Sequence, residues 1–368
     1  MIPVFQPVIS NKDISRVVAS LKNGEISGSF GKNIPLFEKN FAKFINTKYS
    51  VAVSSGTTAL HLAIAVCDFP KECEIIISST TNIATALAVV HNNCKPVPVD
   101  SDLLTWNLDV SKIEEKITKK TKAIIVVHFL GNPVDMLAIK KIAKKYNLII
   151  IEDAAEAHGA EYKKKKLGSF GDFGCFSLYA NKVITSGEGG VITTNNNYYY
   201  KKLNLYRNLG FTVPRFKHYI CGYNFRMTGY QAAFANSQLE NINSVIKKKI
   251  SIQKMYEKYL SKIKFIQFQK TIDRCKNIHW MVGILVSPKS SISKDVLSKK
   301  LKKKGIETRN FFMSMREQPC LKKFFSKKKN LTQKSNFLWK NGLYLPSSHN
   351  LSEKKIKYIC SVIKNIFL

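Results

Sequence analysis

The sequence is poor in acidic residues and in arginine. The 368 residues include 25 Asp and Glu against 59 Lys and Arg, a formal net charge of +34, yet only seven of the cations are arginine. Arginine is the side chain that binds phosphates and base edges with two parallel hydrogen bonds, so its scarcity argues against a dedicated nucleic-acid-binding protein. The lysine runs at 163–166 and 302–304 favour only an unspecific attraction for anionic substrates.

Long apolar runs and metal-binding patterns are also missing. No apolar run reaches the roughly 20 residues that a membrane-spanning helix needs, and the opening MIPVFQ lacks the basic and apolar regions of a signal peptide. The eight cysteines form no CxxC pair and no His/Cys cluster at zinc spacing. We therefore expect a reduced, cytoplasmic protein without a metal site or a membrane contact.

What is present is a regular alternation of strand-like and helix-like segments, in a chain whose hydrophobic fraction of 45% suits a large core. This alternation predicts a mostly parallel sheet with helices on both faces. From about Asn241 a long lysine-rich helix and then mixed strands and helices follow. We predict a large domain over 1–240, including its N-terminal segment, and a smaller α+β domain over 241–368. The strand-like segments are 51–53, 75–77, 95–99, 124–127 and 148–151, and the helix-like segments are 59–66, 84–90 and 137–145.

Polar side chains that could take part in catalysis or binding follow the ends of these strands. The strand 148–151 runs into Asp153, at the edge where open α/β sheets bind ligands. Further on, Ser177 and Lys182 follow another apolar segment, and Gly56-Thr57 opens a helix after a strand, which suits a phosphate. A carboxylate, a hydroxyl and a lysine so placed match pyridoxal 5'-phosphate, which forms an imine with a lysine. Taken singly, Lys182 could be a surface lysine and Asp153 a helix cap.

Two stretches carry a resemblance to a known family. IEDAAEAHGAEY…GSFGDFGCFSLYANKVITSGEGGVITTN and GYNFRM, in this order, resemble the DegT/StrS family of pyridoxal-phosphate-dependent nucleotide-sugar aminotransferases, and the likeness covers nearly the whole chain. It implies an α/β fold of fold type I, with a mostly parallel central sheet flanked by helices and a smaller C-terminal domain. It also implies a homodimer with shared active sites.

The resemblance implies a substrate class as well. We expect transfer of an amino group from L-glutamate to the 4-keto carbon of a GDP-linked 4-keto-6-deoxy-D-mannose, for surface polysaccharide. A UDP- or dTDP-linked 4-keto-6-deoxy sugar stays open as an alternative substrate. A catalytically degenerate binding or regulatory relative is the alternative of another class.

Roles for single residues also follow from the resemblance. Lys182 would form the imine and move protons, and a lysine there favours transamination, because the dehydratases of the family have histidine. Asp153 would hold the pyridine nitrogen protonated, and Glu156 would contact the ring hydroxyl. The residues expected to hold the phosphate are Gly56, Thr57, Thr58, Ser177 and, from the partner subunit, Asn224.

Two departures from the family pattern concern the substrate pocket. Asn82 stands where relatives place an aromatic ring that stacks on the cofactor, and asparagine lacks that stacking area. Met313 and Arg316 stand where histidines are common; Arg316 would bind a diphosphate oxygen or simply be exposed. His128 would line the pocket as a structural histidine, in preference to an acid–base role. The expected substrate-binding residues are Ser29, His128, Arg309 and Arg316.

Overall fold

A seven-stranded sheet forms the centre of the molecule in a computed structural model, which describes residues 1–325 and 331–367. The strand order is β1-β9-β8-β5-β4-β2-β3, and β9 alone runs antiparallel to the others within this sheet. The carboxyl ends of the parallel strands therefore meet at one edge. The strands are β1 (Tyr49–Val53), β2 (Glu74–Ser78), β3 (Lys95–Val99), β4 (Thr121–Val127), β5 (Ile149–Asp153), β8 (Phe173–Ser177) and β9 (Gly190–Thr194).

Helices cover both faces of this sheet, because the apolar strand residues alternate between two buried clusters. On β1, Val51 and Val53 pack into one cluster and Ala52 into the other. The cluster with Val51 contains side chains of α3 (Gly56–Ala65), α4 (Ile83–His91) and α6 (Asn197–Arg207). The opposite cluster contains side chains of α2 (Asn33–Ile45), α5 (Met136–Tyr146), α7 (Gly229–Glu240) and the first part of α8 (Ile242–Leu260).

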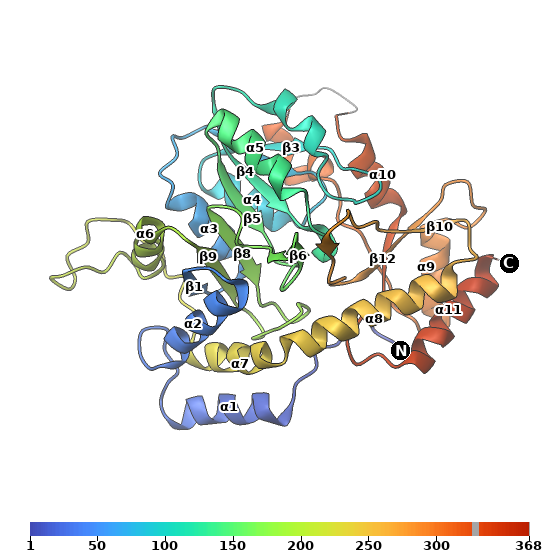
Figure 1. The fold of residues 1–368 in the computed structure, drawn as a ribbon, viewed down its shortest axis with the longest axis horizontal. Coiled ribbons are helices and arrows are strands. Elements are labelled where there is room, and N and C mark those ends of the chain that lie inside the picture. The colour runs from blue at the N-terminus through green and yellow to red at the C-terminus, as the bar shows by residue number, and fades with distance from the viewer. Residues whose placement is uncertain (326–330, 368) are drawn as a thin grey trace.

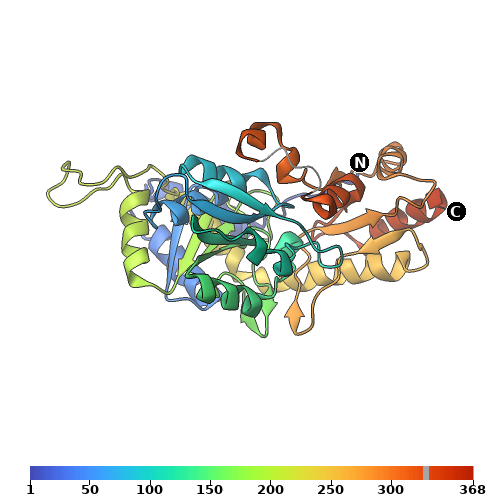
Figure 2. The same ribbon diagram turned by 90° about the horizontal axis from the view of Figure 1, so that it is seen from above.

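A second, antiparallel sheet lies beside the first and has its own buried cluster. Its order is β10-β12-β14-β13, and the cluster fills the space between this sheet and the helices α8, α9 and α11. The long helix α8 runs from the central sheet to the second one (Figures 1 and 2). The elements are β10 (Ile266–Phe268), β12 (Val282–Val286), β13 (Arg309–Asn310), β14 (Gly342–Leu345), α9 (Lys294–Lys303) and α11 (Glu353–Phe367).

The remaining elements are short or peripheral. Helix α1 packs along α7 at the lower edge of the view in Figure 1. The remaining elements are α1 (Asn11–Lys22), α10 (Gln333–Asn341), the small sheet of β11 (Cys275–Lys276), β6 (Glu161–Tyr162) and β7 (Lys165–Lys166), and the 3-10 turns Val110–Lys112, Glu114–Lys116, Phe129–Gly131, Met315–Glu317 and Pro319–Phe324.

The predicted fold class is confirmed. The expected strands and helices are all present, with ends that differ by a few residues: the strand predicted over 148–151 continues to Asp153, and the helix predicted over 59–66 begins at Gly56. The division into domains at residue 240 stays a prediction. Within residues 1–325 and 331–367, no helix is long and apolar enough to cross a membrane, and no group of His, Cys, Asp and Glu side chains could hold a metal ion.

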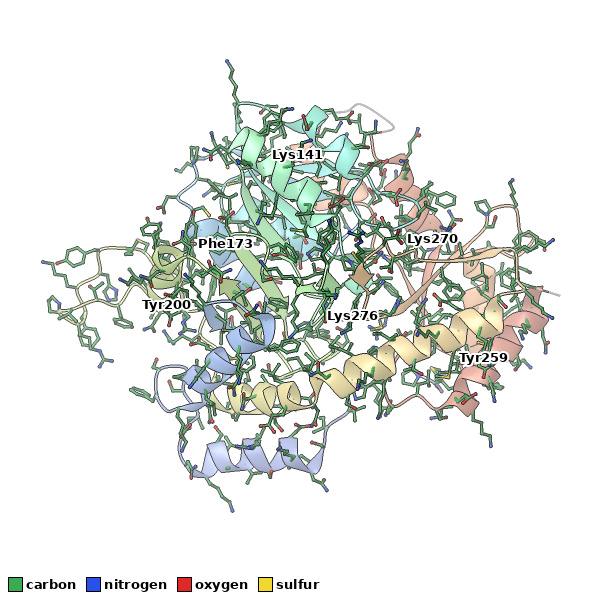
Figure 3. All side chains as sticks on the ribbon, in the orientation of Figure 1. Lys141, Phe173, Tyr200, Tyr259, Lys270 and Lys276 are labelled. Atoms are coloured by element: carbon green, nitrogen blue, oxygen red, sulfur yellow. The ribbon has the colours of Figure 1, made fainter. Side chains whose placement is uncertain are left out.

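Most of the lysine excess lies at the surface, and Lys249 is the most deeply buried exception. Lysine side chains such as Lys141, Lys270 and Lys276 extend from separate elements (Figure 3), whereas Lys249 of α8 is 1% exposed. Its Nζ donates to the carbonyl oxygens of Trp280, at 2.6 Å, and Ser347, at 2.7 Å. Burial lowers the pKa of Lys249 from its ordinary 10.5 to about 7. One buried amine thus ties the long helix to two loops of the second sheet.

This amine should make stability depend on pH. Between about pH 7 and 10.5 the unfolded chain holds a proton on Lys249 that the folded chain has released, so the Lys249 contribution to stability rises with pH in that window. We expect the free energy of unfolding of the wild type, relative to Lys249→Met, to rise by roughly 2–4 kcal/mol from pH 7 to pH 9.5. Urea unfolding of both proteins at both pH values measures it, and a constant difference would contradict the prediction.

Candidate active site

A cavity of about 370 Å³ opens between the two sheets, at the carboxyl ends of β2, β4, β5 and β8. One side is formed by these strand ends and by the start of α3, and the other by residues before β12 and on β13 and β14. Its lining includes Ser55, Gly56, Thr57, Asn82, Asp153, Glu156, Ser177, Tyr179, Lys182, Glu188, Trp280, Arg309, Phe312 and Tyr344.

Asp153 places a carboxylate at the bottom of this cavity, because β5 ends on it. The residue is 6% exposed; its Oδ2 accepts a hydrogen bond from Thr85 Oγ1 at 2.8 Å, and its Oδ1 one from the amide of Ala155 at 3.3 Å. Burial raises the pKa of Asp153, and in the described part of the chain it forms no ion pair. Among the described residues, this carboxylate therefore has two hydrogen-bond donors and no cationic partner.

Lys182 reaches the cavity from the loop after β8 and lies between a carboxylate and a ring. Its Nζ is 3.7 Å from Glu156 Oε1 and 4.0 Å from the centroid of the Trp280 ring. Burial lowers the pKa of Lys182, and burial raises the pKa of Glu156 to about 7, against the charge of Lys182. The other oxygen of Glu156 accepts from the amide of Leu130 at 2.9 Å. Burial thus disfavours the charged form of both groups and brings their two pKa values closer together.

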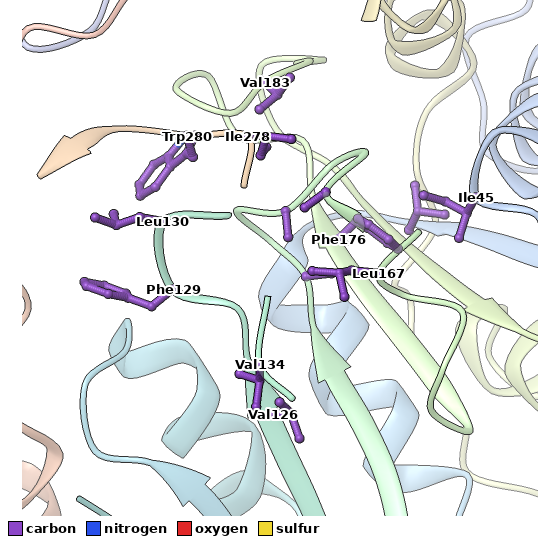
Figure 4. Packing of buried hydrophobic residues seen from close by; sticks show 14 of the residues in the cluster. Ile45, Val126, Phe129, Leu130, Val134, Leu167, Phe176, Val183, Ile278 and Trp280 are labelled. Carbon is purple, nitrogen blue, oxygen red and sulfur yellow. The ribbon is translucent and has the colours of Figure 1, made fainter. Parts of the chain in front are cut away.

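Trp280 is fixed from two sides. Its Nε1 donates to the carbonyl oxygen of Asn181 at 2.7 Å, next to Lys182 in sequence, and its amide donates to the carbonyl oxygen of Leu130 at 2.9 Å. Figure 4 shows Trp280 beside Leu130, with Ile278 close by. The Trp280 ring is thus held by two loops. One carries Lys182, and the other carries Leu130, whose amide donates to Glu156.

The start of α3 forms an anion-binding cradle. Ser55 caps the helix by accepting from the Thr58 amide at 3.1 Å, which leaves the amides of Gly56 and Thr57 without partners among the described residues. A Cβ on Gly56 would lie 2.6 Å from Ser177 Cβ, so only glycine lets the cradle approach this serine. Thr58 itself does not line the cavity, because its hydroxyl donates to the Ser55 carbonyl oxygen at 2.8 Å.

These groups fit pyridoxal 5'-phosphate. The cradle with Ser177 suits the phosphate, Asp153 lacks the partner that a protonated ring nitrogen would supply, and Lys182 is a buried primary amine with a lowered pKa. Of the described residues that line the cavity, Lys182 is the only lysine and Arg309 the only arginine. The roles assigned to the single residues stay predictions.

The structure does not bring every predicted site residue to this cavity. Asn82 lines it, with its side chain accepting from the Ala84 amide at 3.0 Å as the cap of α4, and Arg309 lines it as well. Ser29 and Asn224 are exposed outside the cavity of their own chain. Arg316 packs its guanidinium 5.3 Å from the centre of the Phe325 ring, also outside the cavity.

His128 lies behind the cavity wall instead of in it. It is fully buried; its Nδ1 accepts from the Val134 amide at 3.3 Å, so its Nε2 donates to Glu152 Oε2 at 3.2 Å. Glu152 precedes Asp153 on β5, and successive strand residues point to opposite faces. Its contacts suit a structural histidine, but it is not among the residues that line the cavity, where we expected it.

The sequence analysis missed the residues that the second sheet contributes, above all Trp280, Phe312 and Tyr344. Aromatic residues in strand-like segments of the smaller unit resemble core residues, and most of them are core residues. No spacing in the sequence marks those that face the cavity. The nearest signal in the sequence was the departure from the family pattern in residues 309–316, which pointed to this part of the chain as a wall of the substrate pocket.

Comparison with known proteins agrees with this geometry. The model of the DegT/DnrJ/EryC1/StrS aminotransferase family matches residues 7–364. A GDP-perosamine synthase of Escherichia coli O157:H7 is 38% identical over 367 residues, covering 100% of this chain and 98% of the relative. A UDP-4-amino-4,6-dideoxy-N-acetyl-beta-L-altrosamine transaminase of Campylobacter jejuni subsp. jejuni serotype O:23/36 (strain 81-176) is 30% identical over 374 residues, covering 100% and 97%.

The fold and the cofactor have a solved counterpart. The structure of E. coli GDP-4-keto-6-deoxy-D-mannose-3-dehydratase with bound hydrated PLP superposes with a TM-score of 0.92 at 25% identity, covering 99% of each chain. Together with the lysine, carboxylate and anion cradle of the cavity, these similarities establish a fold-type-I enzyme that depends on pyridoxal phosphate. The chain belongs to the DegT/DnrJ/EryC1/StrS aminotransferase family.

Proposed function

We propose that this sugar aminotransferase moves an amino group from L-glutamate to the 4-keto carbon of GDP-4-keto-6-deoxy-D-mannose in the cytoplasm, for the O antigen of a surface lipopolysaccharide. Lys182 carries the proposal for the reaction, because it lies in one cavity with Asp153 and Glu156. The similarity to a GDP-perosamine synthase supports the substrate. A UDP- or dTDP-linked 4-keto-6-deoxy sugar is the second candidate, and the Campylobacter relative supports the UDP form.

The chain's own residues have distinct tasks in this reaction. When bound, pyridoxal phosphate supplies an electron sink for the carbanion that forms when the donor loses its α-proton. Lys182 Nζ takes this proton from the donor's Cα, and burial favours the neutral amine that can do so. Glu156, with a pKa of about 7, holds or returns a proton at Nζ. Asp153 would supply the negative charge that keeps the ring nitrogen protonated.

We propose further that the enzyme acts as a homodimer with shared sites. The loop between α6 and α7 projects away from the molecule (Figure 1) and exposes Val213, Phe216 and Tyr219, whose side chains are 94%, 75% and 67% accessible. Exposed apolar residues in one projecting segment are typical of an interface. Asn224 lies in this loop, exposed outside its own cavity, which suits a contact with the phosphate in the other subunit.

Absorbance of the holoenzyme tests the reaction and the substrate. We expect L-glutamate to bleach the visible band of the lysine-bound cofactor, and GDP-4-keto-6-deoxy-D-mannose to restore it. If only a UDP or dTDP sugar restores the band, the proposed reaction stands and the proposed GDP-linked substrate is wrong. A band that glutamate does not change would favour the degenerate binding protein over the enzyme.

A further inference from the structure

Tyr344 is a buried phenol whose hydroxyl lacks a partner. The residue lies on β14, is 4% exposed and lines the cavity, and its Oη forms no hydrogen bond within residues 1–325 and 331–367. Buried hydroxyls are almost always paired in native proteins, since an unpaired one loses its hydration without a replacement. An unpaired hydroxyl on a cavity wall is therefore a group whose partner is a ligand.

The ring of Tyr344 cannot turn this hydroxyl elsewhere, because other rings enclose it. The centroids of Phe311, Phe312 and Trp280 lie 4.8, 6.1 and 6.2 Å from that of Tyr344. Trp280 is itself fixed by its bonds to Asn181 and Leu130. The position of the hydroxyl is thus set before any ligand binds, which is what a selective contact requires.

The hydroxyl is a neutral donor at working pH. Burial raises the pKa of Tyr344 well above its ordinary value, and the charge of Glu156 raises it further. A neutral phenol donates to an uncharged oxygen such as a sugar hydroxyl or ring oxygen.

Arg309 stands directly beside Tyr344 and extends the same wall outward. The two residues face each other across the antiparallel pair β13 and β14, so their side chains lie on the same face of the sheet. The Arg309 side chain is 51% exposed, and its Nε is 3.8 Å from Glu307 Oε1. From the mouth inward, the wall therefore offers a cation and then a neutral donor, which is the order of a diphosphate followed by a sugar.

We propose that Tyr344 is a specificity residue for the nucleotide-sugar substrate: its Oη donates a hydrogen bond to an oxygen of the sugar ring, inward of the diphosphate that Arg309 contacts. This rests on the proposed function, because it assigns a contact within that reaction. The amino donor, which is smaller and carries no sugar, does not need this hydroxyl. The two half-reactions should therefore respond differently to its loss.

The variant Tyr344→Phe removes only the hydroxyl and keeps the ring packing. We expect kcat/KM of the holoenzyme for the keto sugar to fall ~10- to 100-fold, while the rate with L-glutamate and the cofactor band stay unchanged. GDP-mannose, as an unreactive probe, should raise the melting temperature of the wild type more than that of the variant, whereas GDP should raise both equally. Tyr259→Phe is the matched control, since it removes a hydroxyl that is bonded to Glu353 and lies away from the cavity.

The outcomes separate this proposal from the proposed function. Equal losses with glutamate and with the sugar would make Tyr344 a cofactor-positioning residue and overturn the assignment. Unchanged kinetics with the sugar, and equal melting shifts with GDP-mannose, would overturn it as well. A wild type that reacts with glutamate but with no nucleotide sugar would remove the substrate proposal and this contact together.

Discussion

Lys182→Ala should abolish amino transfer and leave the fold intact. The variant loses the amine that binds the cofactor and moves the donor's α-proton, and no other lysine within residues 1–325 and 331–367 lines the cavity to replace it. General acid–base catalysis alone contributes roughly 10²–10⁴-fold, and the covalent role adds to it, so we expect a loss of more than ~10³-fold in the single-turnover rate with glutamate. The melting temperature should not fall, because the change removes a cation that burial disfavours.

Chemical rescue distinguishes this result from misfolding. A small primary amine fits the space that the lysine side chain leaves beside Glu156 and Trp280, and it should restore part of the proton transfer in proportion to its concentration. Lys276→Ala is the matched control, because this lysine is 43% exposed, pairs with Glu161 and lies outside the cavity. Retention of even a tenth of the wild-type rate in Lys182→Ala would contradict the assignment.

Asp153→Asn should be the second most damaging change. Asparagine keeps nearly the same shape and can still accept from Thr85, but it cannot carry the negative charge that keeps the ring nitrogen protonated. Losses of this kind of fixed charge or dipole reach roughly 10²–10³-fold in kcat. The measurement is kcat with saturating glutamate and sugar, together with the cofactor dissociation constant.

Asp153→Glu supplies the comparison. It keeps the charge and moves the carboxylate by one methylene, so we expect it to retain more activity than the asparagine variant. If both variants lose activity equally, the position of the carboxylate, and not its charge, is what the reaction needs. If neither loses activity, another group holds the ring nitrogen.

The alternating segments predicted the central sheet well because strand and helix periods differ and both faces of a parallel sheet are apolar. Asp153 and the cradle at Gly56 could be located for the same reason, since strand ends and helix starts are local features. The reversed direction of β9 could not be seen, because a five-residue buried strand gives the same pattern in either direction.

The second wall of the cavity escaped prediction for a physical reason. Tyr344 and Arg309 follow Lys182 by more than a hundred residues and share its cavity only when the two sheets pack together, and no local pattern records that packing. His128 shows the converse limit: its strand-end position suggested a ligand contact, yet the alternation of β5 turns Glu152 toward it and away from the cavity.

The two-walled cavity also orders events while the chain is being synthesised. Gly56, Asp153 and Lys182 all lie in the first 194 residues, which end with β9 and complete the central sheet, whereas Arg309 and Tyr344 are among the last sixty. Because domains form as units from the N-terminus, the anchors for the cofactor emerge from the ribosome well before the wall that faces the sugar. In a nascent chain, the residues that hold the cofactor can therefore take their places first. The residues that select the sugar are added last.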